Sequence, residues 1–307
     1  MVDILVPLDG SPLAERVLPA AAMLARGSGG QLRLLEGISL PLSEGFVGSL
    51  EDLQAAASAY LKDQAERVQR TTGVPASTVV QLGFAPAIIL GEAAHGVGYV
   101  AMSTHGRHGL PRAVLGSVAE QVLRESPVPV YLLPARTEYK DVTAIKHLAI
   151  PLDGSPLSEA VLQPAAALAR QLGAAIALFR VYDPPQGPVL DQHGRIVRGI
   201  DQEVDRIMLE AERYLAPLVR RLRAEGVEAS GTGDIGGEPA SLILHLANHA
   251  SADLIVMATH GRSGLERLRH GSVTEKVLRH SQIPLLAFGR VALQSLVPAE
   301  APAAAGA

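Results

Sequence analysis

A glycine-rich stretch that could bind an anion occurs twice in the chain. It spans Met102 to Val118 in the first copy and Met257 to Val273 in the second. In each copy an apolar run ends in Thr-His-Gly-Arg, and nine residues separate that glycine from a Gly-Ser pair that opens an amphipathic segment. Glycines let a main chain approach a ligand closely, and amides at the start of a helix attract negative charge. The stretch therefore predicts a backbone cradle for phosphate or another anion.

The alternative for this stretch is a tight strand-to-helix connection without a ligand, because glycine-rich turns are common. The same internal spacing in both copies favours the binding site.

A carboxylate could complete the same site. The seven residues from Pro7 to Leu13 recur unchanged at 151–157, which places Asp9 and Asp153 in equivalent positions after an apolar run. In open parallel sheets, ligands bind outside the carboxyl ends of the strands, where the strand order reverses. If the first and fourth strands are neighbours, the carboxylate can accept hydrogen bonds from adenine or ribose while the cradle binds phosphate. The alternative is that each Asp only binds its own backbone in a turn.

Composition describes a globular chain long enough for two domains, with 307 residues, of which 48% are hydrophobic and 19% charged. We expect neither a membrane span nor a cleaved leader, because no apolar run is long enough and the first residues already read as a strand. Cysteine is absent, which excludes disulfides and thiolate metal sites and fits a reducing compartment. A net charge of −4 and an aromatic content of 3% do not favour nucleic acid as a partner.

Apolar runs alternate with amphipathic segments, which predicts an α/β fold made of two repeated units. Each unit is expected to be an open, five-stranded parallel sheet with helices on both faces. In the first unit the expected strands are 3–8, 32–38, 74–82, 98–102 and 128–133, and the expected helices are 11–26, 49–70, 86–95 and 116–125. The second unit repeats this order over 147–288. We therefore expect domains at 1–137 and 143–290, and a disordered tail at 291–307.

The second unit contains 11 residues more than the first between its two motifs, since the Asp motifs are 144 positions apart and the glycine motifs 155. The Pro- and Gly-containing segment 183–199 is the predicted place of this insertion, because a loop lengthens at a small entropic cost.

These motifs resemble the universal stress protein family in its tandem form, over about 1–133 and 147–290. Members that bind ATP carry Gly-x2-Gly-x9-Gly-[Ser/Thr] after the fourth strand and an Asp after the first. The second and third glycines of that pattern have counterparts in both units, whereas its first glycine is replaced by Ser103 and Ala258. A positive φ is costly at such positions without glycine. Where the family offers a Val backbone to adenine, this chain has Gly37 and Val181.

The resemblance implies a Rossmann-like, adenine nucleotide alpha-hydrolase-like fold and an adenine nucleotide ligand: ATP, or AMP or ADP, with or without Mg²⁺. It also implies a cytoplasmic role in stress response or signalling, no metabolic reaction, and pairing of the two domains. Self-association of whole chains as a homo-oligomer stays open. The residues implied to bind the nucleotide are Pro7, Leu8, Asp9, Gly37, Met102, Ser103, Gly106, Arg107, Gly109, Gly116, Ser117 and Val118 in the first unit, and Pro151, Leu152, Asp153, Val181, Met257, Ala258, Gly261, Arg262, Gly264, Gly271, Ser272, Val273 and Thr274 in the second.

Two other functions stay open. The replacements at Ser103 and Ala258, with Gly37, favour a regulatory module whose clefts are empty and which acts through partner proteins. A slow ATPase or a self-phosphorylating protein could use hydroxyls such as those of Ser117 and Ser272, but no general base or paired carboxylates for Mg²⁺ are evident. The chain is therefore not assigned as an enzyme.

Three further patterns are weaker than they look. Residues 231–236 spell a dinucleotide fingerprint, but they follow a third strand rather than a first, and we interpret them as a loop that permits turns. His245 and His249 lie four apart, yet the Glu that a zinc protease needs is missing, so a solvated helix face is expected. His105 and His260 have no evident orienting carboxylate and are interpreted as structural or phosphate-facing.

Each unit ends in an apolar strand at the edge of its sheet, at 128–133 and 283–288. Exposed edges of this kind favour pairing with another edge. A linker of about a dozen residues reaches roughly 40 Å when extended, so we expect the two edges to pair within one chain.

Overall fold

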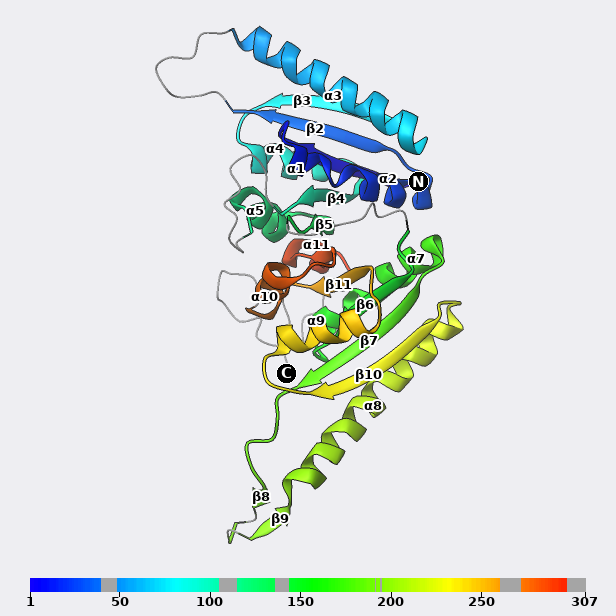
Figure 1. Cartoon of the computed structure of the whole chain (residues 1–307), viewed down its shortest axis with the longest axis vertical. Coiled ribbons are helices and arrows are strands. Elements are labelled where there is room, and N and C mark those ends of the chain that lie inside the picture. The colour runs from blue at the N-terminus through cyan, green and yellow to red at the C-terminus, as the bar shows by residue number, and fades with distance from the viewer. Residues whose placement is uncertain are drawn as a thin grey trace, which may run out of the picture.

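The computed structural model describes residues 1–39, 49–104, 115–135, 144–190, 192–193, 195–259 and 272–296. It has the expected α/β fold, built around one ten-stranded sheet in the order β10-β7-β6-β11-β12-β5-β4-β1-β2-β3 (Figure 1). The first half contains β1 (Asp3–Leu8), α1 (Pro12–Glu15), α2 (Leu18–Ser28), β2 (Leu32–Ile38), α3 (Leu50–Thr72), β3 (Ala76–Leu82), α4 (Ala85–Ala93), β4 (Val97–Ser103), α5 (Ser117–Glu125) and β5 (Val130–Leu133).

The second half repeats this order with one additional hairpin and a final helix. It contains β6 (His147–Pro151), α6 (Pro156–Ala160), α7 (Leu162–Leu172), β7 (Ala175–Tyr182), β8 (Val189–Leu190), β9 (Ile196–Arg198), α8 (Ile200–Ala224), β10 (Ala229–Ile235), α9 (Pro239–His249), β11 (Leu254–Ala258), α10 (Ser272–His280), β12 (Leu285–Phe288) and α11 (Arg290–Gln294). Strands β8 and β9 form a separate two-stranded sheet.

Helices cover both faces of the large sheet, and each face has one core cluster that runs through both halves. Helices α2, α3, α7 and α8 bury their apolar side chains against one face, and α4, α5, α9 and α10 bury theirs against the other. Neighbouring residues of β1 divide between them, with Ile4 and Val6 in one cluster and Leu5 in the other. Because a strand alternates its side chains, this near-continuous apolar run is what a strand covered on both faces requires.

The first helix of each half is split in two, which corrects the single helix expected over 11–26. Ser11 and Ser155 cap the short helices α1 and α6, each accepting a hydrogen bond from the amide three residues later. Pro19 and Pro164 then lie in the first turn of α2 and α7. A proline has no amide hydrogen to donate to the carbonyl four residues earlier, so the helix breaks there.

The two halves join through their last strands, as the apolar edges predict. Strand β5 pairs antiparallel with β12, with Leu132 opposite Leu285 and Tyr131 opposite Leu286. All four of these side chains are at most 1% exposed. The described residues therefore form one continuous sheet whose two edges are β3 and β10, rather than two sheets that touch through loops.

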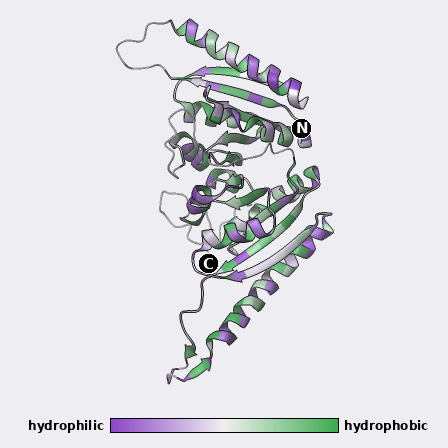
Figure 2. Cartoon of the chain, viewed as in Figure 1, coloured by the Kyte–Doolittle hydropathy of each residue, from purple (hydrophilic) through white to green (hydrophobic). Residues whose placement is uncertain are grey.

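The insertion in the second half forms the β8–β9 hairpin and the first turns of α8. Tyr60 of α3 and Tyr214 of α8 make equivalent contacts, and they are 154 positions apart, so ten of the 11 added residues precede Tyr214. The predicted segment 183–199 holds much of the insertion, and the longer helix α8 holds the rest. The hairpin projects from the body of the protein (Figure 1), and Figure 2 colours parts of it as hydrophobic. Its strands expose apolar side chains, including Ile196 and Val197 of β9.

The dinucleotide-like sequence is part of a strand, which corrects its interpretation as a loop. Gly231 and Gly233 lie within β10, under α8. A Cβ on Gly233 would lie 2.4 Å from the Cβ of Ala211, and one on Gly231 would lie 3.0 Å from the Cβ of Leu215. These glycines therefore let the helix approach the strand closely, which is a packing role.

The expected disordered tail does not begin at residue 291. Residues 290–294 form helix α11, in which Ala292 and Leu293 are buried. The capping glycine, Gly289, lies so close to α5 that a Cβ on it would be 2.2 Å from the carbonyl oxygen of Leu123. Apolar residues within an Ala- and Pro-rich segment were thus sufficient to hold one more helix turn against the core. Residues 297–307 lie outside the described part.

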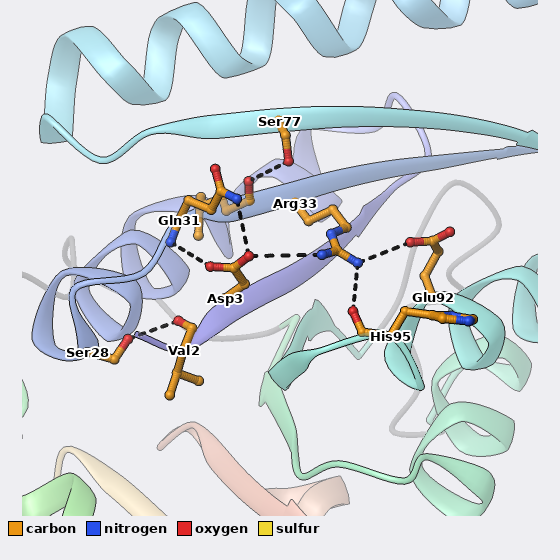
Figure 3. Close-up of polar contacts among 9 residues, drawn as sticks. Val2, Asp3, Ser28, Gln31, Arg33, Ser77, Glu92 and His95 are labelled. Carbon is orange, nitrogen blue, oxygen red and sulfur yellow. Dashed lines mark hydrogen bonds and ion pairs between the residues drawn. The ribbon is translucent and has the colours of Figure 1, made fainter.

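A polar network fixes the amino ends of β1 and β2 (Figure 3). Asp3 accepts hydrogen bonds from the backbone and side-chain nitrogens of Gln31, both at 3.2 Å. Arg33 reaches Asp3 at 3.9 Å and Glu92 at 3.4 Å, and donates to the carbonyl of His95 at 3.1 Å. The network lies at the opposite end of these strands from Asp9, so its charged groups are structural.

Replacement of Gly289 by alanine is expected to destabilise the protein, because the added methyl group meets a backbone oxygen that cannot rotate away. The expected loss is about 1–3 kcal/mol of unfolding free energy. Gly91→Ala is the matched control, since nothing lies within 4 Å of its Cβ position in helix α4; it should gain about 0.5–1 kcal/mol. Urea denaturation of both variants measures this, and equal effects would contradict the tight contact between α11 and α5.

Candidate nucleotide site

The two motifs of each half meet because the first and fourth strands are neighbours. Strand β1 pairs in parallel with β2 on one side and with β4 on the other, and Leu5 is opposite Val100. The strand order thus reverses between β1 and β4, and their carboxyl ends reach the same edge of the sheet. The second half repeats this arrangement with β6 and β11. We call the residues around Asp9, Ser103 and Gly116 the first site, and those around Asp153, Ala258 and Ser272 the second site.

Each Asp is held in a tight turn by the serine two residues later. In the first site one oxygen of Asp9 accepts from the backbone nitrogen of Ser11 at 3.0 Å and from its hydroxyl at 2.6 Å. Asp153 and Ser155 form the same pair at 2.9 and 2.6 Å. The intervening glycines have φ near +76°, a conformation that glycine adopts without strain. The turn therefore uses part of the carboxylate and fixes its direction.

A main-chain hydrogen bond joins the residues on either side of the first glycine-rich stretch. The Gly116 nitrogen donates to the Thr104 carbonyl at 2.9 Å, so the chain returns close to where it left strand β4. Gly116 is the N-cap of α5 and makes no side-chain cap, which leaves the first-turn amides of this nine-residue helix without a capping side chain from that position. Ser117 is exposed and Val118 is half-buried.

Hydroxyl groups at the strand ends are used inside the protein. Ser103 donates to the carbonyl of Leu13 at 2.6 Å, which ties β4 to the Asp9 turn and to α1. In the second site the corresponding residue is Ala258, and the buried Thr274 of α10 instead donates to the Ala258 carbonyl at 3.3 Å. The two sites thus have different local hydrogen bonds, because Ala258 has no hydroxyl in place of Ser103, and Thr274 has one in place of Ala119.

The other candidate residues divide into those that line the strand ends and those outside the described residues. Leu8, Leu152, Met102 and Met257 are buried, whereas Pro7 and Pro151 are half-buried. Gly37 and Val181 are the next-to-last residues of β2 and β7. A Cβ on Gly37 would lie 3.3 Å from the side chain of Ile88. Ser272 and Val273 begin α10. Outside the described residues lie Gly106, Arg107, Gly109, Gly261, Arg262, Gly264 and Gly271, together with His105 and His260.

A tyrosine–glutamate pair next to each Asp was missed by the sequence analysis. Tyr60 donates to Glu15 at 3.1 Å, and Arg67 also reaches this carboxylate at 2.8 Å. Tyr214 donates to Glu159 at 2.9 Å. Burial raises the pKa of both tyrosines well above the usual value, and the neighbouring glutamates raise it further. A comparison of the two halves for recurring polar residues, rather than for motifs, could have found these pairs.

One position in the second strand of each half carries opposite charges in the two halves. Glu36 of β2 is in register with Leu8, next to the Asp9 turn. Its counterpart in β7 is Arg180, which donates to the Leu152 carbonyl at 3.3 Å, next to the Asp153 turn. Neither residue stood out in the sequence, because a single charge in an apolar run has no motif around it.

Other candidate sites are weaker. His245 and His249 stack on each other on the exposed face of α9 with ring centroids 6.5 Å apart, as a solvated helix face predicts. Within the described residues, no group of three or more side chains could hold a metal ion, and no helix is both long and apolar enough to cross a membrane. A groove of about 550 Å³ lies between α3 and β3, but none of the candidate residues lines it.

The tyrosine pKa values give a prediction at alkaline pH. Because folding raises the pKa of Tyr60, the stability that comes from its neutral form is complete below the unfolded value of about 10 and is lost as the pH rises beyond it. Glu15→Gln removes one cause of the shift, so Tyr60 should ionise at a lower pH than in the wild type. Absorbance at 295 nm measures this cleanly, since the chain has six tyrosines and no tryptophan. Glu92→Gln, which changes a carboxylate in the network around Arg33, should leave the titration unchanged.

Comparisons with known proteins agree with this architecture. The sequence model of the Universal stress protein family matches residues 1–134 and again 144–289. A universal stress protein of Mycobacterium tuberculosis is 25% identical over 97% of this chain and 98% of its own length, and one of Methanocaldococcus jannaschii is 30% identical over 46% of this chain and 80% of its own. The solved structure of an Archaeoglobus fulgidus universal stress protein matches with a TM-score of 0.69 at 21% identity, covering 94% of this chain and 98% of that one. The chain therefore belongs to the universal stress protein family, with the family's domain present twice in tandem.

Proposed function

We propose that this protein binds ATP or another adenine nucleotide at the carboxyl ends of the strands that carry its two motifs, and that it acts in stress response by binding rather than by catalysing a metabolic reaction. We place it in the cytoplasm. The observation that carries the proposal is that, in each half, the strand leading into the Asp turn is the neighbour of the strand that precedes the helix of the glycine motif, where the strand order reverses. That is the position at which open parallel sheets bind ligands.

The two parts of the site suit the two ends of a nucleotide. A carboxylate offers about four lone-pair sites, so Asp9 or Asp153 can accept from a ribose hydroxyl or an adenine amino group as well as from its serine. The amides at the start of α5 and α10 suit phosphate, because the helix dipole and the amide hydrogens both favour an anion there. ATP, ADP and AMP all present these groups, with or without Mg²⁺.

Calorimetric titration of the full chain with ATP, AMP and GTP tests the proposal. Heat with ATP or AMP and less with GTP is the expected result, because GTP lacks the adenine amino group. No heat with any of the three at millimolar concentration would end the proposal, since that corresponds to a binding free energy weaker than about 4 kcal/mol.

The variant Asp153→Asn, and separately Asp9→Asn, tests the role of the carboxylate. Asparagine keeps an oxygen that can accept from Ser155 or Ser11, so the turn is preserved while the charge is removed. A hydrogen bond to a charged group contributes about 1.5–3 kcal/mol, so we expect roughly tenfold weaker nucleotide binding from at least one of these variants. Asp3→Asn is the matched control on the same strand, at its other end, and should bind as the wild type does.

A further inference from the structure

The two sites differ in a charged side chain next to the Asp turn, which is the half-buried Glu36 in the first site and the buried Arg180 in the second. Glu36 and Arg180 occupy equivalent positions. Each lies near the carboxyl end of the second strand of its half, beside the strand that leads into the Asp turn. Both lie on the face of the sheet that the long helices α3 and α8 cover. One half therefore has a carboxylate where the other has a guanidinium.

Arg180 is buried between two aromatic rings. Its side chain is 4% exposed, and its guanidinium carbon lies 5.0 Å from the ring centre of Tyr182 and 5.1 Å from that of Tyr214. The two aromatic faces stabilise the cation but do not neutralise it. Its Nε is buried and has no hydrogen-bond partner within the described residues. Burying a cation costs free energy, which a nearby negative charge and hydrogen bonds can offset.

The guanidinium also touches the turn itself. A Cβ on Gly154 would lie 2.8 Å from Nη1 of Arg180, so the cation packs against the residue that follows Asp153. The same nitrogen, Nη1, donates to the carbonyl of Leu152, immediately before Asp153. Arg180 thus lies against the backbone on both sides of the Asp that the ligand would contact.

The first site has the opposite electrostatic character. Burial is the largest cause of the raised pKa of both Tyr60 and Tyr214, but Glu36 adds to the rise at Tyr60 whereas Arg180 opposes it at Tyr214. Ile38 stands where Tyr182 stands in the second site, so no aromatic ring faces that position from β2. The other charges near Tyr60 are Glu15 and Arg67, which pair with each other at 2.8 Å. Among the residues that the structure describes, the first site is therefore the more negative of the two.

We propose that the two sites are not equivalent: the second site, with Arg180, binds the phosphorylated nucleotide, and the first site, with Glu36, excludes it. This rests on the proposed nucleotide-binding function and adds its stoichiometry, one anionic nucleotide per chain. Arg180 acts here as a positioning and electrostatic residue, because it holds the Asp153 turn and compensates for the carboxylate that an anionic ligand must approach.

Calorimetry on the full chain with ATP as the probe tests the proposal through stoichiometry and variants. The wild type should bind one ATP per chain. Arg180→Met should weaken binding by roughly tenfold to a hundredfold, as expected for loss of a charge-assisted contact, and Arg180→Lys should restore most of it. Glu36→Gln should leave the strong site unchanged. Arg33→Met, which removes an ion-paired arginine at the far end of the strands, should bind as the wild type does.

The outcomes separate the two proposals. Two equal sites per chain, or a single site weakened by Glu36→Gln and not by Arg180→Met, would overturn the inequivalence while leaving nucleotide binding intact. Absence of binding in the wild type would overturn nucleotide binding itself. If Arg180→Met does not fold, photo-crosslinking of the wild type with 8-azido-ATP replaces it. Labelled peptides from the second half alone support the proposal, and labelled peptides from the first half contradict it.

Discussion

The pairing of strand β4 with β1, rather than with β3, is the constraint on which the functional part of this protein depends. The chain must cross over the sheet after β3 to reach that place, and the crossing puts two sequence motifs about 95 residues apart at one edge. The Asp9 turn and the first turn of α5 then lie at the same edge of the sheet, although they are far apart in the sequence. The hydroxyl of Ser103 donates to the carbonyl of Leu13 and so holds the end of β4 against α1, which follows the Asp9 turn. The second half repeats the crossing, but there Thr274 supplies the local bond in another way.

Much of this arrangement could be predicted from the sequence, because it is governed by patterns that repeat. The apolar runs gave the strands, and the bounds 3–8 and 32–38 agree with β1 and β2 residue for residue. The identical segments around Asp9 and Asp153 gave the repeat. The apolar edge strands gave the join between the halves, which the structure confirms as an antiparallel pair.

What could not be predicted depends on contacts between distant residues. Gly233 reads as a loop residue in the sequence, and only the position of Ala211 on α8 shows that it serves close packing. The break before Pro19 could have been recognised from the lost backbone bond alone. Arg180 is different, since its role depends on Tyr182 of its own strand, on Tyr214 of α8 and on a glutamate at the equivalent position in the first half. The surroundings of such a side chain can be recognised only from the three-dimensional structure.

The join between β5 and β12 has a consequence for how the protein is made. Strand β5 ends at residue 133, but its partner begins at residue 285, so the first half leaves the ribosome with an apolar edge that nothing can yet cover. About 150 more residues must be synthesised first, which takes on the order of ten seconds or longer at usual rates of translation. During that interval the exposed edge of one nascent chain can pair with the same edge of another. Fusion of the two domains in one polypeptide therefore places the correct partner strand on the same chain. It also fixes the order of synthesis, so that the edge strand β5 is always exposed before β12 exists.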